Sequence, residues 1–149
     1  MPAGDAPAIA DQALLDELRG LLVSVSVQAL RQAARRWSWP LRGTAKAEIV
    51  EQLIERLTDP AQMYRVVQSL PPDAREVLAW LAVLDQDKSA VRRIEAAVNA
   101  GSGSTLDLAA INSILANLVA GCLVFDRGYL GYQTPAVYNR WLPRVEAAR

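Results

Sequence analysis

Two short amphipathic helices joined by a stiff loop are predicted by SVQALRQAARRWSWPLRGTAKAEIVEQLIERL, residues 26–57. Ser26 is a good N-cap, because its hydroxyl can accept a hydrogen bond from a free amide of the first turn. Apolar side chains then recur at the helical period until Trp39-Pro40, where proline pushes the backbone out of the helical region. Thr44 is the expected cap of the second helix, whose apolar residues again recur every third or fourth position.

The same segment concentrates positive charge. No acidic residue occurs between Glu17 and Glu48, and the interval holds six cations, Arg19, Arg31, Arg35, Arg36, Arg42 and Lys46. The whole chain carries 16 Lys+Arg and 16 Asp+Glu, so this charge is segregated rather than general. A concentrated basic patch on a compact helical element is typical of a nucleic-acid-binding module. The alternative is a solvated basic face on which the arginine stems only cover apolar surface.

The segment 26–57 resembles the SAP motif family, a helix–extended loop–helix unit, and the related N-terminal module of the Rho terminator. The resemblance is carried by Val25, Ser26, Val27, Leu30, Arg31, Ala34, Arg35, Gly43, Thr44, Lys46, Ala47, Glu48, Ile49 and Leu53. It implies DNA binding through the loop and the start of the second helix. In this chain those positions are Arg35, Arg42, Thr44 and Lys46.

Three further residues belong to the candidate nucleic-acid site by their own chemistry. Arg31 and Arg36 extend the basic patch along the first helix. Trp39 lies on the loop before a proline, where it is either a packed lid or an exposed platform on which a base stacks. Trp37 continues the apolar stripe of the first helix and is expected in the core.

The residues before this segment predict a covering helix. Residues 1–8 are mostly small residues and prolines and are expected to be disordered. Residues 9–23 are amphipathic and should cover the core of the basic module, because about thirty residues enclose too little interior to be stable alone. The first module therefore spans residues 9–58.

The second region, residues 59–149, contains clear helix and strand signals. Asp59-Pro60 is an N-cap followed by proline at the first helical position. Further helices are predicted at 73–84, at 90–100, and from a cap at Thr105 or Asp107 to Gly121. The strands CLVFD and YLGYQ should flank a tight Arg127-Gly128 turn, and Thr134-Pro135 should start a last helix.

Three helices followed by a β-hairpin is the order of a winged helix, and residues 73–142 resemble that superfamily by architecture. The predicted fold is thus mainly α, a SAP-like helix–loop–helix with a covering N-terminal helix and then a winged-helix-like domain with one short β-hairpin. The combination is similar to accessory regions of some bacterial DNA helicases, which implies a role beside DNA repair or helicase machinery. The chain contains no phosphate-binding GxxxxGK[ST] sequence of its own.

The helix in the recognition position, LDLAAINSILANLVA, contains no Lys or Arg. Its exposed face is expected to consist of Ala109, Asn112, Ser113, Ala116, Asn117 and Ala120. Such a face suits contact with another protein, because a DNA reader needs phosphate neutralisation close by. DNA readout by the asparagines and a plain solvated surface are the alternatives. Arg127 on the hairpin is a candidate phosphate contact.

Composition excludes several classes of chemistry. The chain has no His and only Cys122, so neither a zinc site nor histidine-dependent catalysis is expected. No cofactor loop, membrane span or secretory leader is recognisable, and we expect a cytoplasmic protein.

The sequence therefore predicts a non-enzymatic DNA-binding protein that contacts the phosphate backbone of duplex DNA with little sequence specificity. Five engaged cations would give a salt slope of about −4. A protein–protein adaptor acting through the neutral helix face is the alternative function. Single-stranded DNA and RNA are alternatives to duplex DNA.

Overall fold

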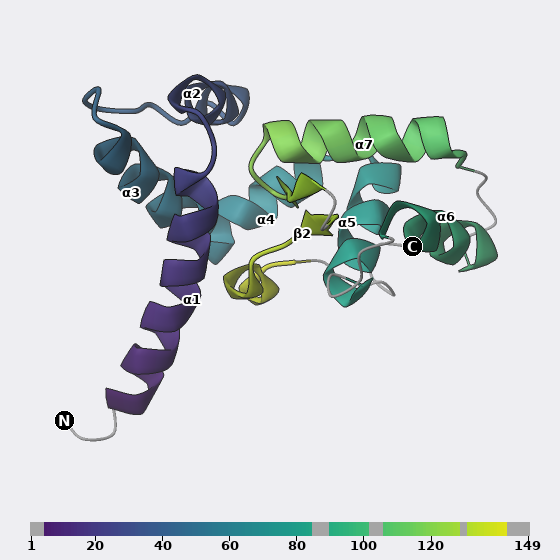
Figure 1. Ribbon diagram of the computed structural model, residues 1–149, viewed down its shortest axis with the longest axis horizontal. Helices are drawn as coiled ribbons and strands as arrows, with labels where there is room; N and C mark the ends of the chain where they lie inside the picture. The colour runs from purple at the N-terminus through teal and green to yellow at the C-terminus, as the bar shows by residue number, and fades with distance from the viewer. Residues whose placement is uncertain (1–4, 85–89, 102–105, 129–130, 143–149) are drawn as a thin grey trace.

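The computed structural model describes residues 5–84, 90–101, 106–128 and 131–142, and this part of the chain is mainly helical with one small antiparallel hairpin (Figure 1). The α-helices are α1 (Asp5–Val23), α2 (Val27–Arg36), α3 (Lys46–Leu57), α4 (Pro60–Ser69), α5 (Pro72–Leu84), α6 (Ala90–Gly101) and α7 (Leu108–Ala120). They are followed by β1 (Phe125–Asp126), β2 (Tyr132–Gln133) and a 3-10 helix, η3 (Ala136–Arg140). None of the described helices is long and apolar enough to cross a membrane.

Three helix starts follow local capping chemistry. The side chains of Ser26, Asp59 and Asp107 each accept a hydrogen bond from a first-turn backbone N–H, of α2, α4 and α7 respectively. Thr105, the other predicted cap of α7, lies outside the described residues. The prediction for α3 is wrong, because its N-cap is Ala45, which has no side-chain oxygen, and Thr44 lies one residue too early.

Helix α1 begins at Asp5, so residues 5–8 of the tail expected to be disordered are helical. Pro7 fits there, because a first-turn amide has no intrahelical partner to lose. Residues 1–4 lie outside the described part of the chain.

The N-terminal helices enclose a shared core. Helices α1 and α2 both pack against α3. Leu18 and Leu22 of α1 are fully buried together with Leu30 of α2 and Leu53 of α3. Helix α1 therefore covers the core of the basic helix–loop–helix, as its amphipathic pattern predicted.

In the C-terminal half, α5, α6 and α7 pack against one another, and the hairpin follows α7 (Figure 1). The strands pair with Phe125 opposite Gln133 and Asp126 opposite Tyr132. Strand β1 is shorter than CLVFD predicted. Of YLGYQ, Tyr132 and Gln133 form β2, and the first two residues lie outside the described part of the chain, as does part of the predicted turn region. At the start of this region Asp126 accepts a 2.8 Å hydrogen bond from the N–H of Gly128.

The last predicted helix is a single 3-10 segment, η3, and Thr134 does not cap it. A carboxylate from the other end of the chain does so instead, since Glu17 Oε1 accepts a 2.7 Å hydrogen bond from the N–H of Ala136. An ion pair of 2.6 Å between Arg140 and Asp11 lies beside this contact. Helix α1 therefore stabilises η3, although more than a hundred residues separate the two in sequence. No local sequence pattern predicts this contact.

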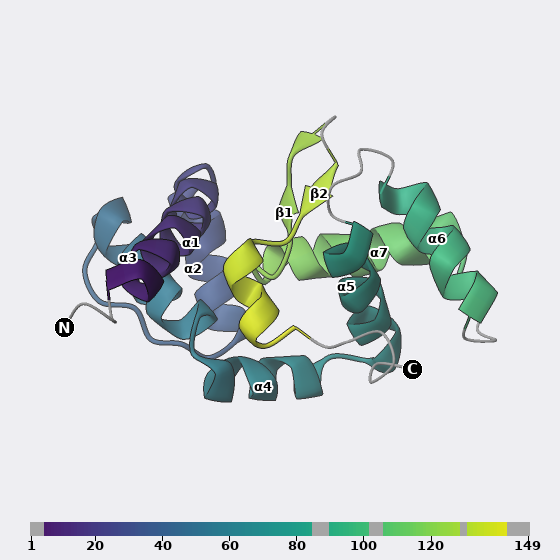
Figure 2. The same ribbon diagram turned by 90° about the horizontal axis from the view of Figure 1, so that it is seen from below.

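Two tryptophan N–H groups join the two halves of the molecule. Trp37, at the end of α2, donates a 2.8 Å hydrogen bond to the carbonyl of Gly121 at the end of α7. Trp141, after η3, donates one of 2.7 Å to the carbonyl of Leu57 at the end of α3. Figure 2 shows η3 lying between the N-terminal helices and α5. One hydrophobic cluster, from Leu18 to Tyr138, runs through both halves.

Candidate nucleic-acid interface

The loop between α2 and α3 begins with a defined helix ending. The N–H of Trp39 bonds to the carbonyl of Ala34 at 2.8 Å, and the N–H of Ser38 bonds to that of Arg35 at 3.1 Å. This pair of bonds is a Schellman motif, in which Ser38 takes the left-handed position with a φ of 61°. The motif turns the chain sharply out of α2 and directs Trp39 back onto the protein.

Gln52 of α3 fixes the far end of this loop. Its Oε1 accepts a 2.8 Å hydrogen bond from the N–H of Arg42, and its Nε2 donates one of 2.7 Å to the carbonyl of the same residue. The backbone of Arg42 is therefore held against α3 while its side chain is exposed. Attachment at both ends fixes the backbone from which the charged side chains of the loop extend.

The predicted site residues differ in exposure. Arg35, Arg36, Arg42 and Thr44 are exposed, while Arg31 and Lys46 are half-buried. Arg31 reaches the loop, where its Nη2 lies 3.4 Å from the carbonyl oxygen of Gly43. The guanidinium groups of Arg35 and Arg42 form no hydrogen bond or ion pair within the described residues, so both are available to a ligand.

The Trp39 side chain is packed against the protein and is not exposed on its surface. It is 8% exposed and belongs to the hydrophobic core. Of the two alternatives for Trp39, this burial agrees with the packed lid, and stacking of a base on the ring stays a prediction. Trp37 is half-buried beside it, with ring centroids 6.5 Å apart.

Lys46 has a structural partner that its sequence position did not suggest. Its Nζ donates a 2.5 Å hydrogen bond to the carbonyl of Val23, the last residue of α1. A cation at this place satisfies a free carbonyl and opposes the negative end of the helix dipole. Lys46 thus caps α1 from α3, and its role in phosphate binding stays a prediction.

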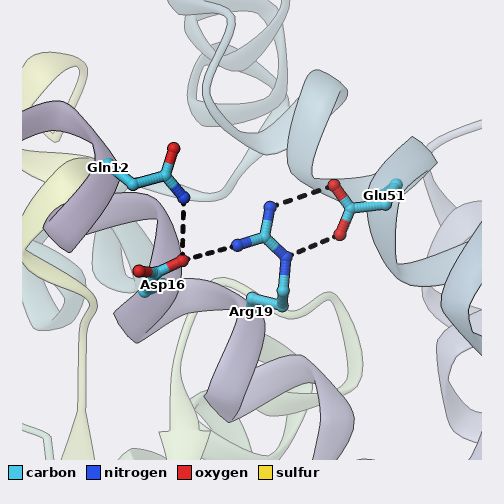
Figure 3. Close-up of polar contacts among 4 residues, drawn as sticks. All are labelled: Gln12, Asp16, Arg19 and Glu51. Carbon is cyan, nitrogen blue, oxygen red and sulfur yellow. Dashed lines mark hydrogen bonds and ion pairs between the residues drawn. The ribbon is translucent and has the colours of Figure 1, made fainter. Parts of the chain in front are cut away.

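Arg19 does not contribute to an open basic surface. Figure 3 shows its guanidinium between two carboxylates, with Nε 2.7 Å and Nη2 3.0 Å from the two oxygens of Glu51 and Nη1 2.7 Å from Asp16. The hydrogen bond from Arg19 lowers the pKa of Glu51 below its usual value. The acid-free interval in the sequence therefore overstates the local positive charge, because folding brings Glu51 across to Arg19.

Three adjoining clefts surround the loop, and Trp39 lines all of them. The α4 cleft, of about 440 Å³, is lined by Arg36, Trp37, Ser38, Trp39, Arg56, Gln62, Arg65, Val66 and Ser69. The α3 cleft, of about 310 Å³, is lined by Trp39, Pro40, Leu41, Arg42, Gln52, Glu55 and Arg56. The α2 cleft, of about 490 Å³, is lined by Arg31, Ala34, Arg35, Ser38, Trp39, Pro40 and Leu41.

These linings define an arginine cluster that consists of Arg31, Arg35, Arg36, Arg42, Arg56 and Arg65. Among the described lining residues Glu55 is the acidic one, and it lines the α3 cleft alone. Arg56 and Arg65 were not anticipated from the sequence, because Arg56 follows three glutamates on α3 and Arg65 belongs to another helix. A usable signal for Arg56 is its position four residues after Gln52, on the same helical face.

The exposed face of α7 matches the prediction. Its inward positions include the buried Ile111, Leu115 and Leu118. The exposed positions are Ala109, Asn112, Ser113, Ala116, Asn117 and Ala120. This neutral face is not remote from positive charge, since Arg36 Nη2 lies 3.4 Å from Asn117 Oδ1. Arg127 is exposed on the hairpin, and its Nη1 donates a 2.9 Å hydrogen bond to Gln133.

No protein-family model, no curated protein and no solved structure matches this chain. The described residues contain no group of three or more Cys, Asp or Glu side chains that could hold a metal ion. What the site offers chemically is a set of arginine donors on a fixed loop and three helices. Arginine forms paired hydrogen bonds with phosphate oxygens, so phosphate is the ligand that this donor set suits best.

Proposed function

We propose that this protein binds nucleic acid, duplex DNA in the first place, by placing the arginine cluster against the phosphate backbone with little sequence specificity. The supporting observation is that six arginines surround one fixed loop while a single described carboxylate, Glu55, lines the same clefts. The proposal includes a cytoplasmic location and no catalytic activity.

The SAP-like and winged-helix-like identities belong to the same proposal. The order α2, extended loop, α3 agrees with the SAP resemblance of residues 26–57, and α5 to α7 with the hairpin follow winged-helix order. Under this proposal the SAP-like unit binds the phosphate backbone of DNA. The winged-helix-like unit would then contact the DNA repair or helicase machinery that the resemblance implies.

Fluorescence anisotropy tests the proposal with a labelled duplex and a labelled single strand at several salt concentrations. Four to five phosphate contacts give a salt slope of about −4, and each contact removed lowers its magnitude by about 0.9. Arg35→Gln and Arg42→Gln should each weaken binding and flatten the slope by this amount. Arg140→Gln is the control with the same charge change away from the loop, and it should leave the slope unchanged because the Arg140 guanidinium is already paired with Asp11. Absence of binding by the native chain at low salt, or binding insensitive to salt, would refute the proposal.

An adaptor function is the second candidate, favoured by the uncharged exposed face of α7. The double change Asn112→Arg, Ala116→Arg separates the two uses of this face. If α7 contacts a protein, the variant loses that protein in pull-downs and binds DNA as before. If α7 lies against DNA beside Arg36, two added cations tighten binding and steepen the salt slope. A variant that changes neither property contradicts both roles for the face.

A further inference from the structure

The α4 cleft collects cations from three different helices. Arg36 comes from the last turn of α2, Arg56 from the last turn of α3 and Arg65 from α4. No carboxylate is among the residues that line this cleft. Three like charges around one concave space repel each other, so the cleft is electrostatically prepared for an anion.

None of these guanidinium groups forms an ion pair within the described residues. Arg56 Nη1 donates a 2.8 Å hydrogen bond to Gln62 Oε1, a neutral acceptor that orients the group without neutralising it. Arg36 has only the long 3.4 Å contact with Asn117 Oδ1, and its guanidinium carbon lies 6.0 Å from the Trp37 ring centroid. Arg65 is exposed and has no polar partner among the described side chains. Most of the five N–H donors of each arginine are therefore unused.

The shape of the cleft favours a compact ligand. Its volume of about 440 Å³ lies within the range of small-molecule sites. Ser38, held in the left-handed conformation between the two tryptophans, adds a hydroxyl to the lining. The apolar part of the wall comes from Trp37, Trp39 and Val66.

The charge of the cleft selects among phosphates. A phosphodiester in a continuous strand carries one negative charge, whereas a phosphate monoester carries about −1.5 to −2 at neutral pH and exposes three acceptor oxygens. Three arginines that converge from separate helices match the monoester in charge and in number of acceptors. The α2 and α3 clefts each contain two arginines, and the α3 cleft also contains Glu55, so both suit the singly charged diester better.

We propose that the α4 cleft is a phosphate-monoester site, formed by Arg36, Arg56 and Arg65, which takes the terminal phosphate of a nucleic-acid strand or the phosphate of a free nucleotide. If the ligand is a strand end, the inference rests on the proposed nucleic-acid binding and adds a preference for phosphorylated ends. If the ligand is a free nucleotide, the inference does not depend on nucleic-acid binding.

The strand arm of the test compares two otherwise identical oligonucleotides, one with a 5′-phosphate and one with a 5′-hydroxyl, both labelled at the 3′ end. The native chain should bind the phosphorylated strand about tenfold tighter, as expected for charge-assisted hydrogen bonds to an added dianion. Arg65→Gln, an exposed change that spares the fold, should reduce this ratio, and Arg56→Gln, Arg65→Gln together should bring it to one. Arg35→Gln, which lines only the α2 cleft, is the matched control and should weaken both strands equally.

The nucleotide arm measures the melting temperature of the full chain with adenosine monophosphate, with inorganic phosphate and with adenosine. Stabilisation by the two phosphates but not by adenosine, lost in Arg65→Gln, supports the site even when no strand binds. If strands bind but the 5′-phosphate makes no difference, and neither phosphate stabilises the chain, the cleft proposal is overturned while the proposed function stands. A ratio that persists in the double variant also overturns it, because the phosphate is then held elsewhere.

Discussion

At the residue scale, Ser38 and Cys122 occupy the same position at the ends of two helices. Each is the left-handed residue of a Schellman motif, and their φ values are 61° and 60°. In the α7 motif the N–H groups of Cys122 and Leu123 bond to the carbonyls of Val119 and Leu118, both at 3.0 Å. Glycine is the usual residue here, because a side chain in the left-handed region costs about 1–2 kcal/mol. Both positions therefore hold backbone strain.

Replacing Ser38 by glycine should raise the free energy of unfolding by up to about 1 kcal/mol. Relief of about 1–2 kcal/mol of strain is partly offset by about 0.5–1 kcal/mol of added freedom in the unfolded chain. Urea unfolding measures the change. Ala116→Gly on the exposed face of α7 is the control and should cost about 1 kcal/mol. Equal losses in the two variants would show that Ser38 is not strained.

The buried Cys122 thiol should lower the free energy of unfolding at alkaline pH. Burial raises the pKa of this thiol from 9.0 to about 12, and burial also raises the pKa of Tyr138, whose hydroxyl donates a 2.7 Å hydrogen bond to the Cys122 carbonyl. Between these pH values the unfolded chain has lost the thiol proton and the folded chain keeps it. Stability is therefore fully present below pH 9 and falls as the pH rises.

Urea unfolding from pH 7 to pH 11 tests this titration. Above pH 9 the native chain should lose up to about 1.4 kcal/mol per pH unit more than Cys122→Ala does. The variant retains Tyr138, whose pKa is raised mainly by its own burial, so the difference between the two proteins reports the thiol. Parallel pH profiles for the two proteins would contradict the burial of this group as the cause.

At the element scale, the contact between the ends of α2 and α7 requires Gly121, because a larger residue would not fit there. A Cβ at Gly121 would lie 2.4 Å from the Cζ2 atom of Trp37, although the φ of −93° is open to any residue. The indole of Trp37 covers this position and bonds to the Gly121 carbonyl. Close approach of the two helix ends thus requires the absence of a side chain.

Gly121→Ala should lower the free energy of unfolding by about 1–3 kcal/mol, the usual cost of overpacking. Thermal and urea melts measure it, and a shift in tryptophan fluorescence should report the displaced Trp37. Gly20→Ala is the control, since a Cβ there meets nothing within 4 Å and α1 should gain up to about 1 kcal/mol. A neutral Gly121→Ala would mean that the indole moves aside freely.

At the scale of the whole molecule, the two halves share one hydrophobic core, and we therefore expect them to unfold as one cooperative unit. The core cluster is continuous from α1 to η3, and Glu17, Trp37 and Trp141 each bond across the halves. Sequence patterns suggested two modules, residues 9–58 and 59–149, because each carries its own helix signals. The side chains that join the halves leave no local signature.

Trp141→Phe tests this coupling, because it removes one N–H donor and keeps most of the ring. The loss of the hydrogen bond to Leu57 should cost about 1 kcal/mol. Native-state hydrogen exchange should show equal loss of protection in α3 and in α5, since both unfold in the same global step. Destabilisation confined to the C-terminal helices would show that the halves unfold separately.

Much of the fold could be predicted because its signals are local. The caps at Ser26, Asp59 and Asp107 and the exposed face of α7 follow from neighbours three or four residues apart. The first strand was predicted too long, because Leu123 and Val124 are buried in the core but lie outside the paired residues. The predicted cap of the last helix, Thr134, was wrong because the N–H of Ala136 bonds instead to Glu17, a residue far away in sequence.

The sequence by itself determined the helices, their faces and the basic loop, because capping, periodicity and proline geometry act over one or two turns. Only the tertiary structure decided which charges are open. It paired Arg19 with Glu51, used Lys46 to cap α1, buried Trp39, and brought Arg56 and Arg65 beside Arg36. Electrostatic interactions depend on distance in space, and the distance between residues far apart in the chain is fixed only when the helices pack.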